Sequence, residues 1–217
     1  MRKLLVTFAL RQEGLTFERR LTRRVSRSGA IVGQLDRFEI AVTWLGIQLT
    51  DPNGLKATIT DLRPEIVINS GFVGAIRTLL EPGDFLLAEN FSSPELLVGL
   101  STGGVFDGRG AFECVDRIAE PGDKMRMNVE GRYIAVDMES ARFGEICKRL
   151  SVPFITARMV SDSCNERIPR IFLGKRISEL PDVFDAVRFA VRMISLRRLL
   201  ADRLAELIAL ISVLAPK

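Results

Sequence analysis

Acidic side chains follow two apolar, strand-like segments in the second half of the chain. The first strand-like segment, Tyr133–Val136, is followed by Asp137, Met138 and Glu139. Ser140–Leu150 then has a helical pattern, and the second strand-like segment, Phe154–Val160, is followed by Ser161 and Asp162. A strand–helix–strand crossover is almost always right-handed and makes its two strands parallel. We therefore expect both carboxylates at one edge of a sheet, where ligands bind in open α/β folds. Turn residues and helix caps are of the same types, so the unit alone leaves that interpretation open as well.

The chain contains no histidine, which narrows the chemistry further. Ser-His-Asp triads, Cys-His pairs and histidine-based metal sites are therefore excluded. The three cysteines, Cys114, Cys147 and Cys164, show no CxxC spacing, so we expect a reducing, cytoplasmic environment. Acid–base chemistry must come from carboxylates, Lys, Arg or the single tyrosine, Tyr133. We expect neither a metal nor a cofactor.

Two earlier strand ends also carry residues that suit a binding site. Glu13 lies on a loop or helix start behind the first expected strand, Lys3–Ala9. A glycine-bearing turn follows the short buried strand Glu65–Asn69, and its Gly71 and Gly74 would let the backbone approach a ligand closely. The turn matches neither GxGxxG nor GxxxxGK[ST], and a tight packing turn explains it equally well.

Strand and helix patterns alternate along the chain, which predicts an α/β fold with a mixed or mostly parallel sheet. The 217 residues, 47% of them hydrophobic, fit one domain over residues 1–217 with a full core. Further expected strands are Phe38–Leu45, Phe85–Ala88, Glu95–Leu100 and Ala111–Val115, and further expected helices are Asn53–Arg63, Glu120–Val129 and Ser195–Leu214.

Charge and hydropathy limit the partners. The net charge is +4, and the cluster Arg19–Arg24 lacks interleaved aromatic residues, so we interpret it as a solvated helix face and expect no nucleic-acid binding. The apolar run in Met1–Leu10 is short and has no cleavage site, which favours a buried strand over a signal peptide. The tail Ser195–Leu214 is too polar and too short to span a bilayer. Membrane association is therefore not expected, and the tail should pack in the core or in a dimer.

Four segments, taken in order, carry a resemblance to a known family. They are Ala9–Glu13 (ALRQE), Pro64–Ala75 (PEIVINSGFVGA) with the EPGD that follows it, Ala135–Ala141 (AVDMESA) and Ala157–Asp162 (ARMVSD). They resemble the purine nucleoside phosphorylase and nucleosidase superfamily. Within that superfamily they are most similar to the 5′-methylthioadenosine/S-adenosylhomocysteine nucleosidases and to the hopanoid-associated phosphorylase-like branch. The resemblance covers most of Lys3–Asp162. It implies a single three-layer α/β domain with a mixed, mostly parallel sheet flanked by helices, and a homodimer.

The resemblance implies catalytic roles for three residues. Asp162 would protonate N7 of the purine, because adenine is a poor leaving group without that proton. Glu13 would position and deprotonate the attacking water, and Arg158 would help to hold that water and the nearby carboxylate. Two or three carboxylates around a developing ribosyl cation would also stabilise it.

The resemblance also implies a set of substrate-binding residues. Glu139 would bind the ribose hydroxyls, Met138 would pack on the sugar and Ser161 would orient the catalytic aspartate. The remaining members of the set are Phe72, Gly74 and Ile118.

The chain departs from the family pattern at four places. Phe72 stands where many nucleosidases have a serine that helps to hold the water. The segment Gly14–Arg24 shows no arginine-bearing phosphate loop, which favours water over phosphate as the nucleophile. The segment Glu89–Leu100 lacks an insertion that helps to build the pocket for the 5′ group, so a bulkier 5′ group is conceivable. Phe112 or Ile118 would replace the aromatic residue that stacks on the purine.

The sequence therefore predicts a nucleosidase that cleaves the N-ribosidic bond of an adenine nucleoside by attack of water. Its substrate would be of the methylthioadenosine or adenosylhomocysteine type, or a nucleoside with a bulky 5′ substituent. Two alternatives stay open at this point. One is a phosphate-dependent purine nucleoside phosphorylase, and the other is a noncatalytic nucleoside-binding protein of the same fold.

Overall fold

Strands from both halves of the chain form one mixed sheet in the computed structural model, which describes residues 1–100, 104–169 and 180–214. The main path of the sheet runs in the order β2-β3-β4-β1-β5-β11-β6-β10-β9, and β7 pairs with β11 and β8 beside it. The strands are β1 Arg2–Phe8, β2 Thr22–Arg27, β3 Ala30–Leu35, β4 Phe38–Trp44, β5 Ile66–Asn69, β6 Phe72–Ala75, β7 Phe85–Ala88, β8 Gly108–Gly110, β9 Phe112–Cys114, β10 Ala135–Asp137 and β11 Phe154–Asp162.

The middle of the sheet is parallel and its margins are mixed. β1 is parallel with both β4 and β5, and β11 is parallel with β5 and β6. β3 pairs antiparallel with both β2 and β4, and β7 with β11 and β10 with β6 are also antiparallel. The predicted mixed, mostly parallel sheet is therefore confirmed, and its parallel part carries the carboxyl ends that matter for a ligand site.

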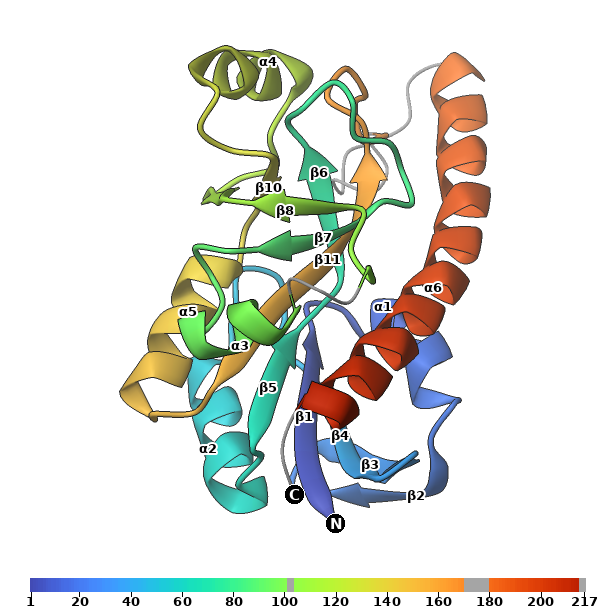
Figure 1. Cartoon of the computed structure of the whole chain (residues 1–217). Helices are drawn as coiled ribbons and strands as arrows, with labels where there is room; N and C mark the ends of the chain where they lie inside the picture. The colour runs from blue at the N-terminus through green and yellow to red at the C-terminus, as the bar shows by residue number, and fades with distance from the viewer. Residues whose placement is uncertain (101–103, 170–179, 215–217) are drawn as a thin grey trace.

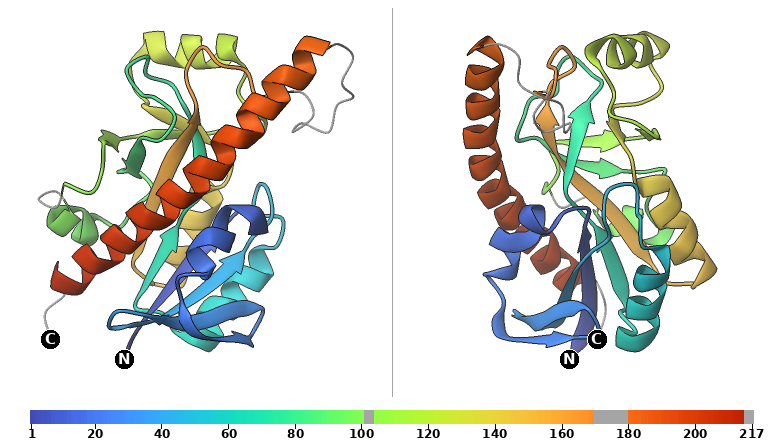
Figure 2. Two further views of the ribbon diagram at one scale, coloured as in Figure 1. Left: turned by 90° about the vertical axis from the view of Figure 1, so that its right-hand side faces the viewer. Right: turned by 180° about the vertical axis from the view of Figure 1, so that it is seen from behind.

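Helices cover both faces of this sheet, which gives the three predicted layers. α1 and α6 lie on one face, and α2 and α5 lie on the other (Figures 1 and 2). α4 lies at the end of the molecule toward which β6 and β11 point (Figure 1). The helices are α1 Arg11–Glu18, α2 Pro52–Leu62, α3 Pro94–Leu100, α4 Pro121–Glu130, α5 Ser140–Arg149 and α6 Leu180–Leu214.

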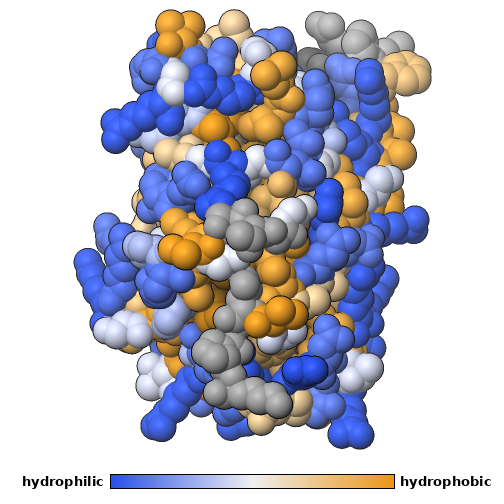
Figure 3. All heavy atoms as spheres, viewed as in Figure 1, coloured by the Kyte–Doolittle hydropathy of each residue, from blue (hydrophilic) through white to orange (hydrophobic). Residues whose placement is uncertain are grey.

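α6 is 35 residues long and crosses the whole molecule diagonally (Figure 2). The sequence predicted only its second half, Ser195–Leu214. Its first half presents apolar side chains to solvent, and apolar spheres line the edge of the molecule where this half lies (Figure 3). Among the described helices, none is long and apolar enough to cross a membrane.

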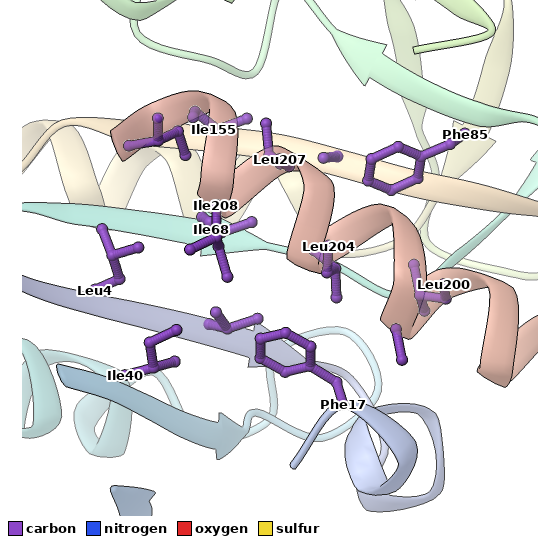
Figure 4. Close-up of a cluster of buried hydrophobic side chains, with 14 of the residues drawn as sticks. Leu4, Phe17, Ile40, Ile68, Phe85, Ile155, Leu200, Leu204, Leu207 and Ile208 are labelled. Carbon is purple, nitrogen blue, oxygen red and sulfur yellow. The ribbon is translucent and has the colours of Figure 1, made fainter. Parts of the chain in front are cut away.

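The core divides into layers because neighbouring residues of a strand point to opposite faces. Leu4, Val6 and Phe8 of β1 pack toward α6, whereas Leu5 packs toward α2 and α5. On the α6 side, the buried residues include Leu200, Leu204, Leu207 and Ile208, which lie over β1, β5 and β11 (Figure 4). Full burial of one such side chain contributes roughly 1.5–3 kcal/mol. Core packing of the tail is thus confirmed.

Three local predictions are wrong. Glu95–Leu100 was expected as a strand but lies in α3, where Pro94 starts the helix. Asn69–Ala75 was expected as a glycine-bearing turn, but its last four residues, Phe72–Ala75, form strand β6, and Gly71 before them makes the bend. The basic cluster Arg19–Arg24 is not a helix face: α1 ends at Glu18, and β2 is an exposed edge strand.

The two strands around α5 are not parallel, which corrects the first expectation. β6 lies between β10 and β11 in the sheet, parallel with β11 and antiparallel with β10. β11 is nine residues long, pairs with β5 at its start and with β6 and β7 at its end, and has a register shift between Val160 and Asp162. The far part of the sheet therefore turns, so that β7, β8 and β10 run across the direction of β11 (Figure 1).

Candidate active site

A cavity of about 280 Å³ opens beside β6, where the ends of β1, β10 and β11 approach one another. Its wall includes all nine side chains or backbone positions that the sequence nominated, brought together from α1, β6, β11, the loop before α4 and the turn between β10 and α5. These residues are Glu13, Phe72, Gly74, Ile118, Met138, Glu139, Arg158, Ser161 and Asp162. The turn of the sheet thus brings Glu139 and Asp162 to one cavity even though their strands are not parallel.

Glu13 lies in the first turn of α1, and its carboxylate folds back onto the start of the helix. The Leu10 amide donates a hydrogen bond to Glu13 Oε2 at 3.2 Å. Burial raises the pKa of Glu13 to about 7, although the Leu10 hydrogen bond and the charge of Arg158 lower it. A carboxylate of this pKa gains or loses a proton near neutral pH, as a general base must.

Gly71 makes room for this carboxylate. Its φ of +129° is rare for other residues, and a Cβ there would stand 2.9 Å from Glu13 Oε2 and 3.4 Å from Arg158 Nη1. A side chain at position 71 would therefore be strained and would also displace Glu13.

Arg158 is fully buried in the middle of β11 and ties three elements together. Its Nε lies 3.0 Å from Asp137 Oδ2, and its Nη2 lies 3.3 Å from Glu139 Oε2. Nη2 also donates to Asn69 Oδ1 at 3.2 Å, and Nη1 donates to the Phe72 carbonyl at 3.3 Å. Burial alone would lower the pKa of Arg158, but the neighbouring carboxylates outweigh it and raise that pKa. Arg158 therefore stays charged and fixes the positions of the carboxylates around it.

Glu139 follows β10 and caps the start of α5, where it is buried. Its Oε2 faces Arg158, and its Oε1 accepts a hydrogen bond of 3.1 Å from the Gln48 amide. Helix α5 begins at the next residue, so the helix dipole favours a negative charge at this position. The arrangement places a carboxylate on the cavity wall, which suits hydrogen bonds from hydroxyl groups.

Asp162 ends β11 and is buried. Ser161 Oγ lies 2.5 Å from Asp162 Oδ1, which fits the orienting role expected of Ser161. The other oxygen, Oδ2, forms an ion pair with Lys124 Nζ from α4, and the lysine side chain is as buried as the aspartate side chain. The carboxylate thus has an engaged donor on each oxygen.

Two residues were expected as alternatives for the aromatic residue that stacks on the purine. Ile118 lines the cavity, whereas Phe112 is buried in a separate core cluster with Val73 and Leu86. Phe72 lines the cavity and packs its ring against the main core.

Helix α6 supplies further wall that the sequence did not nominate. Phe189 and Met193 line the cavity together with Ile168 from the segment after β11. Among the described residues, none from 89 to 100 takes part.

Comparison with known proteins finds relatives of this chain by sequence and by structure. No protein-family model matches the chain. A 5′-methylthioadenosine/S-adenosylhomocysteine nucleosidase of Staphylococcus aureus is 25% identical over 193 residues, covering 72% of this chain and 85% of that protein. The same enzyme of Shewanella loihica is 24% identical and covers 64% of this chain and 75% of that protein.

Solved structures agree over nearly the whole chain. A 5′-methylthioadenosine/S-adenosylhomocysteine nucleosidase of Borrelia burgdorferi, bound to adenine, superposes with a TM-score of 0.76 at 17% identity and covers 95% of this chain and 99% of that one. The futalosine hydrolase of Helicobacter pylori gives a TM-score of 0.72 at 17% identity, covering 96% and 97%. The chain has the nucleoside phosphorylase/nucleosidase fold. Its curated relatives and structural neighbours are members of that superfamily, as the sequence resemblance predicted.

Within this nucleosidase fold, sequence reasoning missed four charged residues of the cavity wall, Arg117, Lys124, Asp137 and Arg197, two of which pair with nominated residues. Asp137 pairs with Arg158 and also accepts a hydrogen bond from the Ser140 hydroxyl. It stands next to Met138 in the AVDMESA motif, so its position behind a strand was a usable signal. Lys124 gave no signal, because a lysine among the polar residues of a short helix looks like any solvated lysine.

The chemistry available in the cavity is acid–base and electrostatic. Among the described residues, no group of three or more Cys, Asp or Glu side chains could hold a metal ion. The cavity instead offers Glu13 with its raised pKa, the fixed Glu139 carboxylate and the Asp162–Lys124 pair. These groups could move protons to and from a bound molecule and stabilise a positive charge that develops between them.

Proposed function

We propose that the protein is a nucleosidase that cleaves the N-ribosidic bond of an adenine nucleoside by attack of water. The observation that carries the proposal is the convergence of Glu13, Glu139 and Asp162 with Arg158 on one cavity. These residues come from distant parts of the sequence, and a protein that only kept the fold would not need all of them. Residues 1–217 act as one domain.

Each of the three carboxylates has a different task in the proposed reaction. Glu139 accepts hydrogen bonds from the ribose hydroxyls and holds the sugar, with Met138 against it. Asp162, oriented by Ser161, delivers a proton to N7, so that adenine leaves as a neutral molecule when the bond to C1′ breaks. Glu13 takes a proton from the water that attacks C1′. The negative charges stabilise the ribosyl cation that forms between these events.

The charges around Glu13 favour water over phosphate as the nucleophile. Arg158 is the cation beside Glu13, and it is already paired with Asp137 and Glu139. With Glu13 ionised, three carboxylates face the Arg158 guanidinium, which leaves an excess of negative charge around that group, even though Arg117 and Arg197 also line the cavity. A phosphate dianion would be repelled there, whereas a neutral water molecule would not. The phosphorylase alternative is therefore the weaker one.

The apolar wall bears on the 5′ group of the substrate. Ile168, Phe189 and Met193 offer a surface for an alkylthio or larger apolar substituent. The curated relatives are named for methylthioadenosine and adenosylhomocysteine, and we infer a substrate of this type or one with a bulkier 5′ group.

The outer side of α6 supports a homodimer. Phe184, Val187, Val191 and Ile194 are 74%, 57%, 60% and 52% exposed. Their spacing places them in one stripe along the helix, and a stripe of this kind is a liability on a monomer. We infer that a second copy covers it, and that the enzyme works in the cytoplasm, in keeping with its free cysteines.

One assay distinguishes the functional alternatives. The protein is incubated with 5′-methylthioadenosine, S-adenosylhomocysteine, adenosine and inosine, each with and without inorganic phosphate, and the products are separated by liquid chromatography. A nucleosidase releases base and free sugar in both buffers. A phosphorylase releases base only with phosphate and forms a sugar 1-phosphate, and a binding protein releases no base at all.

A further inference from the structure

Lys124 is a buried lysine on a short surface helix, α4. Within α4, all of which the structure describes, it is the one buried residue, 1% exposed. A short surface helix usually buries apolar side chains, and burying an ammonium group costs free energy unless it is paired and hydrogen-bonded. A leucine or methionine would pack there at no such cost, so the charge calls for another explanation.

Every hydrogen of the Lys124 ammonium group has an acceptor. Lys124 Nζ is paired with Asp162 Oδ2 and donates to the carbonyl oxygens of Ser163 at 3.0 Å and Glu166 at 3.3 Å. An ammonium group has three N–H donors, so all three are committed. Two of them anchor Lys124 to the backbone after β11, and the third points at the Asp162 carboxylate.

The backbone is shaped to admit this pair. A Cβ at Gly74 would stand 3.2 Å from both Asp162 Oδ2 and Lys124 Cε, and 3.4 Å from Lys124 Nζ. These contacts are tight for a side chain, so the absence of one at position 74 leaves room for the ion pair. The pair also lines the cavity, where a bound nucleoside would meet it.

We propose that Lys124 is a positioning residue for base protonation: it holds Asp162 and supplies, through that carboxylate, the proton that the leaving adenine takes at N7. The inference rests on the nucleosidase function proposed above. As the C1′–N9 bond breaks and its electron pair moves to the base, Asp162 takes a proton from Lys124 Nζ and passes it to N7. Lys124 is left as a neutral amine, and the Asp162 carboxylate is unchanged.

The remaining bond and protons involve the attacking water. Water forms the new bond to C1′ and loses its proton to Glu13. The proton on Glu13 then returns through solvent to the Lys124 amine, so both groups start the next cycle as before. No oxidant, reductant or cofactor is needed.

The test compares two leaving groups in one preparation of enzyme. 5′-Methylthioadenosine needs a proton on its base, whereas 4-nitrophenyl β-D-ribofuranoside loses a phenolate that leaves without one. Lys124→Met, which keeps the length of the side chain and removes the ammonium, should lose roughly 10²–10⁴ in kcat on the nucleoside with little change in KM. Its kcat on the nitrophenyl riboside should stay within about threefold of the parent. The ratio of the two rates cancels any loss of folded protein.

Matched variants sharpen the test. Lys148→Met makes the same change at an exposed lysine of α5 and should leave both rates unchanged. Lys124→Gln keeps a hydrogen bond to Asp162 but has no proton to give, so it should resemble Lys124→Met on the nucleoside. Equal losses of Lys124→Met on both substrates, or the parent ratio in either Lys124 variant, would overturn the inference. A parent protein that cleaves neither substrate would instead overturn the proposed function, and the inference would fall with it.

Discussion

At the scale of single residues, the site separates its carboxylates by their surroundings. Burial raises the pKa of Glu13, Glu139 forms an ion pair with Arg158, and Asp162 forms one with Lys124. The motifs indicated which residues belong to the site, because acids behind apolar strands are visible in a sequence. They also indicated Arg158 but could not indicate Lys124, which reaches the site from a helix whose pattern is that of a solvated surface.

The raised pKa of Glu13 sets the pH dependence of the reaction. The base works only when ionised, so kcat/KM should rise about tenfold per pH unit below pH 7 and level off above it. A pH–rate profile from pH 5 to 9 measures this. Glu13→Gln should lose the rising limb and roughly 10²–10⁴ of the rate, whereas a parent profile that is flat between pH 5 and 8 would rule out Glu13 as this base.

The Glu139 carboxylate should matter for both binding and turnover. Glu139→Gln removes a charge-assisted hydrogen bond to the ribose and a charge beside the cation, each worth about 1.5–3 kcal/mol. We expect KM to rise and kcat to fall, with kcat/KM lowered roughly 10–100-fold or more. Glu145→Gln, on the exposed side of the same helix, is the control. Steady-state kinetics of the two variants would contradict the assignment if they were alike.

At the scale of elements, the sequence predicted best where periodicity and burial agree. Phe85–Ala88 is β7 as expected, and α2, α4 and α5 lie within a residue or two of their predicted bounds. Errors arose where short apolar runs suit both strand and helix, as in Glu95–Leu100, and where the sheet turns around β11. Such turns depend on long-range pairing, which a local pattern does not contain.

The long helix α6 makes a stability prediction at this scale. Leu204 is fully buried against the sheet, so Leu204→Ala should lower the free energy of unfolding by about 2–5 kcal/mol. Leu79→Ala, at a leucine that is 91% exposed, should change it by less than about 0.5 kcal/mol. Denaturant unfolding of both variants gives the comparison. Equal effects would mean that α6 does not pack on the sheet as described.

At the scale of the whole molecule, the apolar stripe on α6 predicts a dimer. Sedimentation velocity at micromolar concentration should show a particle of twice the chain mass. Val191→Glu and Ile194→Glu together should shift it to a monomer, because burying two unpaired charges at the interface is costly. Val129→Glu, at a more exposed valine on α4, should leave the dimer intact. A parent protein that sediments as a monomer would contradict the proposal.

The central claim is that this cavity hydrolyses an adenine nucleoside, and one measurement tests it most directly. Adenine release from 5′-methylthioadenosine is followed in phosphate-free buffer for the parent protein and for Asp162→Asn, which keeps the shape of the side chain but has no proton to deliver. We expect steady release of adenine and free sugar in equal amounts by the parent, and a rate lower by roughly 10²–10⁴ for the variant, with nucleoside binding largely kept. Release by the variant at the parent rate, or none by the parent, would contradict the account.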